Sequence, residues 1–302
     1  MRKIKIGSRT SALALTQAEI IIDTLKEKFP QYEYEIVKIK TKGDMILDKT
    51  LSKIGGKGLF VKEIQTALLT EEIDIAVHSM KDMPAEAPEG LILGAITKRE
   101  DPRDVIVMKE DNSLDRLSKG ARIGSSSLRR KAQLLSLRED LEMVDIRGNV
   151  ATRLSKMDTE GLDAVILAAA GLNRLGYSNE NFYYLDTENF TPAVGQGALG
   201  CEIRENDKEI VEMLQQINDT DTYNCVMGER IFLKILEGGC HAPIGAYGKR
   251  IGDDLEITGM VASVDGQTII RHTEKGKFED YLTIGEKLAQ GIIDLGGKKF
   301  LK

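Results

Sequence analysis

The sequence is poor in the residues that build disulfide frameworks and metal sites. Its 302 residues include three cysteines and three histidines. The cysteines, Cys201, Cys225 and Cys240, are odd in number and show no CxxC spacing, so neither a disulfide framework nor a zinc ribbon is expected. The histidines are too scattered for a histidine-based metal site. We therefore predict no bound metal.

Long apolar runs are also missing. No stretch approaches the roughly 18 uninterrupted apolar residues of a membrane-spanning helix. The basic N-terminus, MRKIKIGSRTSALALTQAEI, passes quickly into polar residues and lacks a small-residue cleavage pattern, so no signal peptide is expected. These absences predict a cytoplasmic protein that does not associate with membranes. No heptad or long apolar edge is evident, and we expect a monomer.

The residues that are present indicate an ordinary globular protein with at least two domains. Hydrophobic residues make up 41% and charged residues 30% of the chain, and the length suffices for two or three domains. Strand-like KIKIG, YEYEIVKIKT and IDIAVHS alternate with helix-like segments, a βαβ pattern typical of a mainly parallel sheet. Helical spacing is clearest in the apolar residues Leu15, Ala18, Ile22, Leu25 and Phe29.

Two breaks in this pattern divide the chain. KREDPRD (98–104) and TPAVGQGALG (191–200) read as two crossings between α/β lobes, which would form a hinge with a ligand cleft between the lobes. We predict lobe one at residues 1–97 and 198–217 and lobe two at 103–192. A small C-terminal α+β domain is predicted at 220–302, with Asp265-Gly266 as a hairpin turn.

Three strand-to-helix junctions carry serine or asparagine together with arginine: IGSRTSA, IGSSSLRRKA and DIRGNVATR. Helix N-termini favour anions, and arginine adds paired donors for carboxylate or phosphate. Residues 122–153 hold six Arg and one Lys against four acids in a chain of net charge −6. Helix capping alone is the alternative interpretation. The same segment contains no aromatic residue, and the pI near 5.4 disfavours nucleic acid, so a small polyanion is predicted.

The segment IDIAVHSMKDMPAE (73–86) is expected to end a strand near His78 and to place Asp82 on the following loop. Asp82 is either a turn residue or a carboxylate set among arginines to stabilise a developing cation. Cys240 follows two glycines, which leave room for a bulky group; the alternative is a small buried hydrophobe. The glycine-rich SKIGGKGLF (52–60) is either a linker or a lid over the cleft.

The motifs HSMKDMP, IGSSSLRR, DIRGNVATRL, AVGQGALG and LEGGC, in this order, closely resemble the porphobilinogen deaminase (hydroxymethylbilane synthase) family. The resemblance runs from about Lys5 to the end and is looser in the last 55 residues. It implies two hinge-linked α/β lobes of the type II periplasmic-binding-protein kind plus a small C-terminal α+β domain. It also implies a transferase of tetrapyrrole and heme biosynthesis.

The family condenses four porphobilinogen molecules head to tail with release of ammonia and then hydrolyses off linear hydroxymethylbilane. The resemblance implies a dipyrromethane cofactor joined to Cys240 by a thioether. Asp82 matches the catalytic acid, which would protonate the departing amine and then stabilise the cationic azafulvene. Lys57 and Phe60 match the lid, although a core role for Phe60 stays open, and His241 departs from the family's usual residue.

The remaining site residues are carried over by position as groups that bind carboxylates. Those implied for the cofactor, besides Asp82 and Cys240, are Ser79, Lys81, Ser127, Arg129, Arg130 and Arg147. Those implied for the substrate are Arg9, Ser11, Gln17, Arg147, Arg153 and Arg174. The alternative function is a non-catalytic hinge-type binding protein for a small polycarboxylate, which would leave Asp82 and the cysteine in its glycine-rich loop unexplained.

Overall fold

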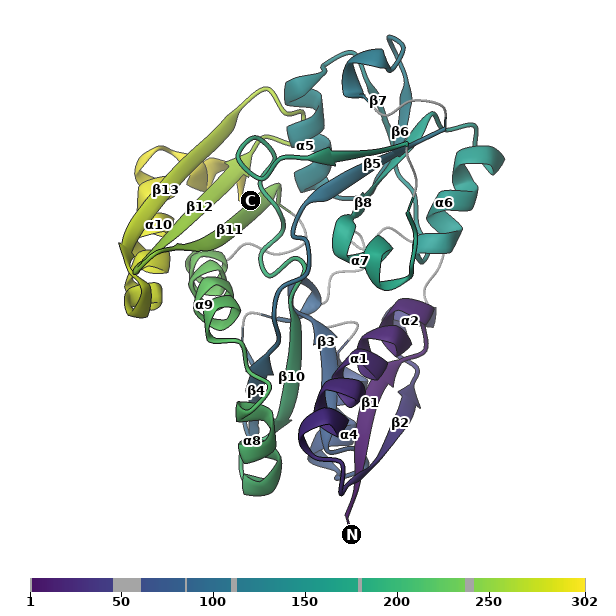
Figure 1. Ribbon diagram of the computed structural model, residues 1–302. Helices are drawn as coiled ribbons and strands as arrows, with labels where there is room; N and C mark the ends of the chain where they lie inside the picture. The colour runs from purple at the N-terminus through teal and green to yellow at the C-terminus, as the bar shows by residue number, and fades with distance from the viewer. Residues whose placement is uncertain are drawn as a thin grey trace. The chain divides into compact units, whose positions relative to one another are not determined.

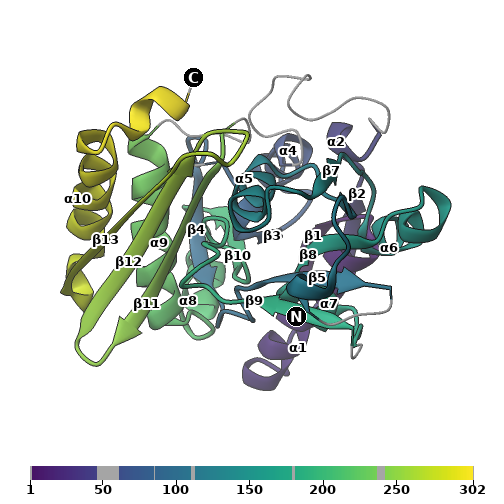
Figure 2. The same cartoon turned by 90° about the horizontal axis from the view of Figure 1, so that it is seen from above.

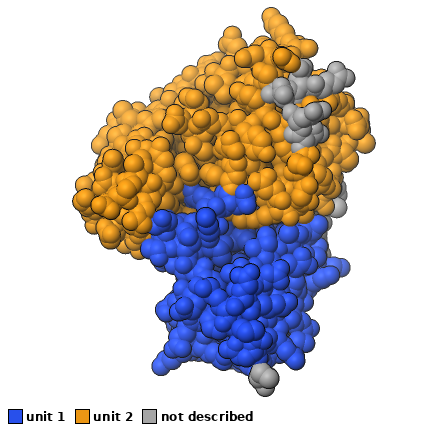
Figure 3. All heavy atoms as spheres, in the orientation of Figure 1, with its two compact units in different colours: residues 1–49, 55–100, 198–223 blue, residues 50–54, 101–197, 224–302 orange. Residues whose placement is uncertain are grey.

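The computed structural model describes residues 2–45, 61–84, 86–109, 113–178, 181–236 and 242–301. The chain divides into two compact units, which are coloured separately in Figure 3. Unit 1 comprises residues 1–49, 55–100 and 198–223, and unit 2 comprises residues 50–54, 101–197 and 224–302.

Unit 1 is built on a five-stranded sheet in the order β2-β1-β3-β10-β4 (Figure 1). Strand β1 pairs in parallel with β2 and β3, whereas β10 runs antiparallel to β3 and β4. The strands are β1 (Lys3–Arg9), β2 (Glu33–Ile39), β3 (Ile75–Ser79), β4 (Leu91–Ile96) and β10 (Leu199–Arg204). The helices are α1 (Ala12–Lys28), α2 (Lys42–Met45), α4 (Lys62–Leu69) and α8 (Lys208–Gln215), with the 3₁₀ turn η1 (Met80–Asp82).

Alternation along the strands places apolar side chains on both faces of this sheet. Ile4 and Ile6 of β1 are fully buried in one core with α1 and α8, and they alternate with exposed Lys3 and Lys5. Ile64 of α4 belongs to a second core with residues of β3 and β4. Helices therefore cover both faces, as the βαβ pattern predicted.

Unit 2 contains a second five-stranded sheet, in the order β7-β6-β8-β5-β9. Here β6 is parallel to β7 and β8, whereas β5 is antiparallel to β8 and β9. The strands are β5 (Asp104–Met108), β6 (Arg122–Gly124), β7 (Glu142–Val144), β8 (Ala164–Ala168) and β9 (Phe182–Leu185). The helices are α5 (Leu128–Leu137), α6 (Val150–Thr159) and α7 (Ala169–Arg174), with the 3₁₀ turn η2 (Leu114–Arg116).

The rest of unit 2 is an antiparallel sheet, β11-β12-β13, covered by helices (Figure 2). Phe232 of α9 and Leu288 of α10 share a core with these strands, while Ala132 of α5 packs against Met260 and Ala262. The strands are β11 (Ile244–Ile251), β12 (Asp254–Ala262) and β13 (Ile269–Lys277). The helices are α9 (Thr220–Ile235), which belongs to unit 2 from Asn224 onward, and α10 (Tyr281–Asp294), with the 3₁₀ turns η3 (Phe278–Asp280) and η4 (Gly297–Phe300).

The two five-stranded sheets share one topology. In the first sheet, β10 lies between β3 and β4 and runs antiparallel to both. In the second sheet, β5 lies in the same way between β8 and β9. The predicted fold class, α/β lobes of the type II periplasmic-binding-protein kind with a C-terminal α+β part, is confirmed. Strands β4, β5, β9 and β10 were not predicted, and the exact domain boundaries stay predictions. Within the described ranges, no helix has the length and apolar character needed to cross a membrane.

Candidate active site

Asp82 ends the 3₁₀ turn η1 that follows the central strand β3. The turn is anchored by Met80, whose buried side chain fills the space above Gly200, and whose amide donates to the Ala198 carbonyl at 3.0 Å. Lys81 and Asp82 are exposed. An aspartate that the sequence singled out therefore lies on a well-anchored turn and is open to solvent.

The strand end before this turn is held by two side chains from elsewhere in unit 1. Buried Gln17 of α1 donates through Nε2 to the Ser79 hydroxyl at 3.3 Å, so two of the predicted helper residues do meet. His78 is buried, and its Nε2 lies 3.2 Å from Oε2 of the fully buried Glu202, which also accepts from Gln65 Nε2 at 2.9 Å. His78 is thus part of the interior, whereas the residues after it reach the surface.

The N-terminus of α1 lies at the end of β1. Arg9, the last residue of the strand, is half-buried, and Ser11 caps the helix by accepting from the Ala14 amide at 3.3 Å. The first turn contains no acidic residue. Because the positive end of the helix dipole is not neutralised within the helix, this junction favours an anion.

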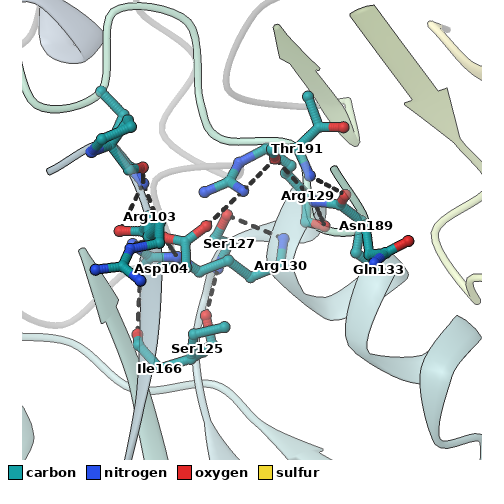
Figure 4. A network of polar contacts seen from close by, with 12 residues as sticks. Arg103, Asp104, Ser125, Ser127, Arg129, Arg130, Gln133, Ile166, Asn189 and Thr191 are labelled. Carbon is teal, nitrogen blue, oxygen red and sulfur yellow. Dashed lines mark hydrogen bonds and ion pairs between the residues drawn. The ribbon is translucent and has the colours of Figure 1, made fainter. Parts of the chain in front are cut away.

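The N-terminus of α5 differs, because its arginines lie inside the protein (Figure 4). Ser127 caps the helix by accepting from the Arg130 amide at 3.4 Å. Asp104, the first residue of β5, is fully buried, and its carboxylate accepts hydrogen bonds from both arginines. The donors are Arg129 Nη1 at 2.7 Å and Arg130 Nε and Nη2 at 2.9 and 2.7 Å. Arg130 Nη1 also donates to the Ile166 carbonyl at 3.1 Å.

The same cluster binds the chain segment that leads out of unit 2. Arg129 Nη1 and Gln133 Nε2 both donate to the Thr191 carbonyl, at 2.7 and 3.0 Å, and the Thr191 amide donates to Gln133 Oε1 at 2.7 Å. Gln196 Nε2 donates to Asp104 Oδ1 at 3.0 Å. Asp104 therefore connects the first residues of β5, the N-terminus of α5 and the second crossing.

Ionisation of Asp104 is favoured by these partners. Burial on its own would raise the pKa of the carboxyl group, but the positive charges of Arg129 and Arg130, together with hydrogen bonds from Arg129 and Gln196, hold that pKa well below its usual value of 3.8. The carboxylate is thus the charged form throughout the neutral range.

The N-terminus of α6 carries arginines that are only half-buried. Asn149 caps this helix by accepting from the Thr152 amide at 2.9 Å, and Gly148 before it has a positive φ of 119°. Arg147 and Arg153 flank the cap, with Arg153 Nε donating to the Gly148 carbonyl at 2.8 Å. Arg174, at the end of α7, donates through Nη2 to the Gly197 carbonyl at 2.6 Å.

Two consecutive segments of the chain match models of the two domains of one protein family. Residues 4–212 match the porphobilinogen deaminase, dipyromethane cofactor binding domain, and residues 223–294 match the porphobilinogen deaminase C-terminal domain. The chain belongs to the porphobilinogen deaminase family. The family predicted from the sequence, with its transferase activity and its dipyrromethane cofactor, is confirmed.

Relatives of this family cover the whole chain. A porphobilinogen deaminase of Alkaliphilus metalliredigens is 64% identical over 100% of this chain and 96% of its own length, and one of Bacillus subtilis is 52% identical over the same shares. Among solved structures, a probable amino-acid ABC transporter extracellular-binding protein from Bacillus subtilis matches with a TM-score of 0.45 at 12% identity, over 72% of this chain and 90% of that one.

Several predicted residues lie outside the part of the chain that the structure describes. These are the anchor Cys240, its neighbour His241, and the lid residues Lys57 and Phe60, whose roles stay predictions. The other two cysteines are buried, and burial raises the pKa of the Cys201 thiol to about 12. No cluster of metal-ligating side chains occurs among the described residues.

Sequence reasoning missed Asp104 and Gln196 as partners of the arginines. Asp104 was read as part of the charged crossing 98–104, and Gln196 as part of a glycine-rich crossing. The available signal was an acid directly before the apolar run VIVM, since a charge at the start of a buried strand needs a partner. Only the fold could supply Arg129 as that partner, 25 residues away.

Proposed function

We propose that this chain makes hydroxymethylbilane by condensing four porphobilinogen molecules head to tail, with Asp82 and Cys240 as its two principal functional residues. The observation that carries the activity is the match to both family domains, in order, along nearly the whole chain. The hinge-type binding protein for a small polycarboxylate is not favoured, because its sites would need neither residue.

The residues present suit an oligopyrrole that carries acetate and propionate groups. The α1 and α6 N-termini offer capped, acid-free first turns next to Arg9, Arg147 and Arg153. Such termini bind carboxylates through free N–H groups and guanidinium donors. Arg9, Ser11, Gln17, Arg147, Arg153 and Arg174 are assigned to the substrate, and Ser79, Lys81, Ser127, Arg129, Arg130 and Arg147 to the cofactor. When bound, the dipyrromethane supplies the terminal pyrrole carbon on which the product is extended.

Asp82 is assigned as the acid that donates a proton to the amino group of porphobilinogen as its carbon–nitrogen bond breaks and ammonia leaves. The resulting carboxylate then balances the positive charge left on the pyrrole. Exposure of Asp82 on an anchored turn supports this role, because the group must reach a bound substrate without reorganising the strand behind it. Proton transfer of this kind contributes typically 10²–10⁴-fold to a rate.

Cys240 is assigned as the anchor of the cofactor. Its thiol would form a thioether, and the flanking glycines, Gly238 and Gly239, would leave the attached group free to turn. The other two cysteines are unsuited to this role because both are buried.

The same proposal covers partners and location. With a pI near 5.4 and no aromatic residue in the arginine-rich segment 122–153, the chain is assigned no nucleic-acid partner. It is proposed to act in the cytoplasm as a monomer.

Intact mass measurement tests the anchor. Wild-type protein should be heavier than its sequence by two linked pyrroles, whereas Cys240→Ala should have the unmodified mass. Cys225→Ala is the matched control and should keep the added mass. If wild type carries no added mass and gains none on incubation with porphobilinogen, the proposed activity is wrong. If Cys240→Ala keeps the added mass, the activity stands but the anchor is another residue.

A further inference from the structure

We propose that Asp104 is a positioning residue for the cofactor. Its carboxylate neutralises Arg130 and fixes that side chain in place, so that Arg129 is the arginine of this pair that binds a ligand carboxylate. The inference rests on the proposed function. The family resemblance implies that both arginines bind the cofactor, whereas here the two are given different tasks.

The two guanidinium groups differ in how many nitrogens the protein occupies. All three nitrogens of Arg130 are used, because Nε and Nη2 donate to Asp104 Oδ1 and Nη1 donates to the Ile166 carbonyl. Arg129 uses Nη1 alone, for Asp104 Oδ2 and the Thr191 carbonyl. Among the described residues, no acceptor binds Arg129 Nε or Nη2. That edge of the guanidinium is the one suited to paired hydrogen bonds with a carboxylate.

Charge counting points the same way. Two arginines and one aspartate leave one net positive charge at the N-terminus of α5, whose first turn contains no acid. A fully buried carboxylate is tolerated only when it is paired, and here Arg130 supplies two of the donors that satisfy it. Arg129 is consequently held by one nitrogen without being neutralised.

The geometry predicts what happens when Arg130 no longer neutralises Asp104. Without the Arg130 guanidinium, Asp104 would face Arg129 alone, and the net charge of the pair would be zero. Arg129 could then turn its second nitrogen toward Asp104 and form a paired contact with it. The protein's own carboxylate would in that case occupy the edge that is otherwise available to a ligand.

Conservative variants separate the two arginines without deleting a buried charge. Arg129→Lys keeps the charge and one donor to Asp104 but removes the Nε–Nη2 edge. Arg130→Lys keeps the charge beside Asp104. We expect bound dipyrromethane, measured by intact mass after expression with porphobilinogen, to fall about tenfold or more in Arg129→Lys, the equivalent of about 1.4 kcal/mol. We expect a smaller loss, of about threefold, in Arg130→Lys, because the charge beside Asp104 is kept. Equal losses, or the reverse order, would overturn the proposal.

A double-variant comparison tests the role of Asp104 itself. Arg130→Met alone should lose the cofactor, and adding Asp104→Asn should restore loading at least in part, because the net charge at Arg129 returns to plus one. A loss in the double variant as great as in Arg130→Met contradicts the proposal. The fraction of protein that carries dipyrromethane is compared at a temperature below the melting temperature of every variant. Differences in stability alone then do not change which variants carry more cofactor.

The other end of α5 offers a matched control. Arg138 and Asp140 form an ion pair of 2.8 Å there, and the corresponding variants Arg138→Met and Asp140→Asn should leave loading unchanged. Failure of this inference is distinguishable from failure of the proposed function. Wild type without any bound pyrrole after incubation with porphobilinogen refutes the function, whereas loaded wild type with equally impaired arginine variants refutes only the role of Asp104.

Discussion

Asp82 and Asp104 each lie next to the carboxyl end of the third parallel strand of their sheet, β3 or β8, and have opposite surroundings. Asp82 follows β3 of the first sheet and is exposed, whereas Asp104 begins β5 of the second sheet and is fully buried between two arginines. Both stand beside basic residues and a proline in the sequence, in KDMP and EDPRD.

The comparison shows that two aspartates with similar local sequences can have different surroundings, which suit them to different roles. Asp104 is satisfied by the protein, so it can organise side chains but cannot reach a substrate. Asp82 is not enclosed by its neighbours, so it can approach one. Burial, rather than the local sequence, therefore separates the positioning aspartate from the one assigned to chemistry.

The largest expected effect is on the rate after changing Asp82. We expect Asp82→Asn to lower kcat by about 10³-fold or more, because both the acid and the charge of the carboxylate are lost. Ammonia release and hydroxymethylbilane formation measure this rate. The free energy of unfolding should stay close to that of wild type, because the side chain is exposed. Turnover near the wild-type rate would remove Asp82 from the mechanism.

Asp104 should show the opposite profile, with a large effect on stability. We expect Asp104→Asn to lower the free energy of unfolding by about 3–5 kcal/mol at neutral pH, because two buried guanidinium groups lose their counter-ion. Since the pKa of Asp104 is lower in the folded state than its usual 3.8, its stabilisation is present in full above about pH 4 and is lost as the pH falls toward the folded-state pKa.

Denaturant unfolding at a series of pH values checks both parts of this prediction. The difference between wild type and Asp104→Asn should be constant from neutral pH down to about pH 4 and should shrink below it. Asp140→Asn, which removes the aspartate of a half-buried ion pair in the same lobe, is the control and should cost less. A difference that grew with acidity would contradict the assignment of Asp104 as a buried carboxylate.

The smallest expected effect concerns the support of the Asp82 turn. Replacing Gln17 by Leu removes the hydrogen bond to the Ser79 hydroxyl, which should cost about 1 kcal/mol of stability. We expect kcat to fall by a few-fold, since the turn stays anchored by Met80. Thermal unfolding and steady-state kinetics measure the two effects, and a loss of kcat as large as in Asp82→Asn would contradict the minor contribution expected of this hydrogen bond.

Much of the architecture was predictable because it depends on local patterns. Helical spacing predicted α1, the strand-to-helix junction at IGSSSLRRKA predicted the start of α5, and Asp265-Gly266 predicted the hairpin between β12 and β13, where Gly266 has a positive φ of 73°. Strands β5 and β10 were missed because each begins inside a segment that was interpreted as a crossing, and their neighbours β4 and β9 were missed with them. Among the site residues, the caps at Ser11 and Ser127 followed from strand-to-helix junctions, but the burial of Arg129 and Arg130 did not.

The sequence alone determined the fold class, the family and the presence of anion-favouring helix ends, because periodicity, capping residues and ordered motifs are local properties of the chain. Only the tertiary structure decided which arginines are enclosed. Arg129 and Arg130 meet Asp104 because β5 and α5 are brought together by the second sheet, and Thr191 and Gln196 join them from a crossing far along the chain. Burial depends on which segments pack against each other, and residue types alone do not encode that.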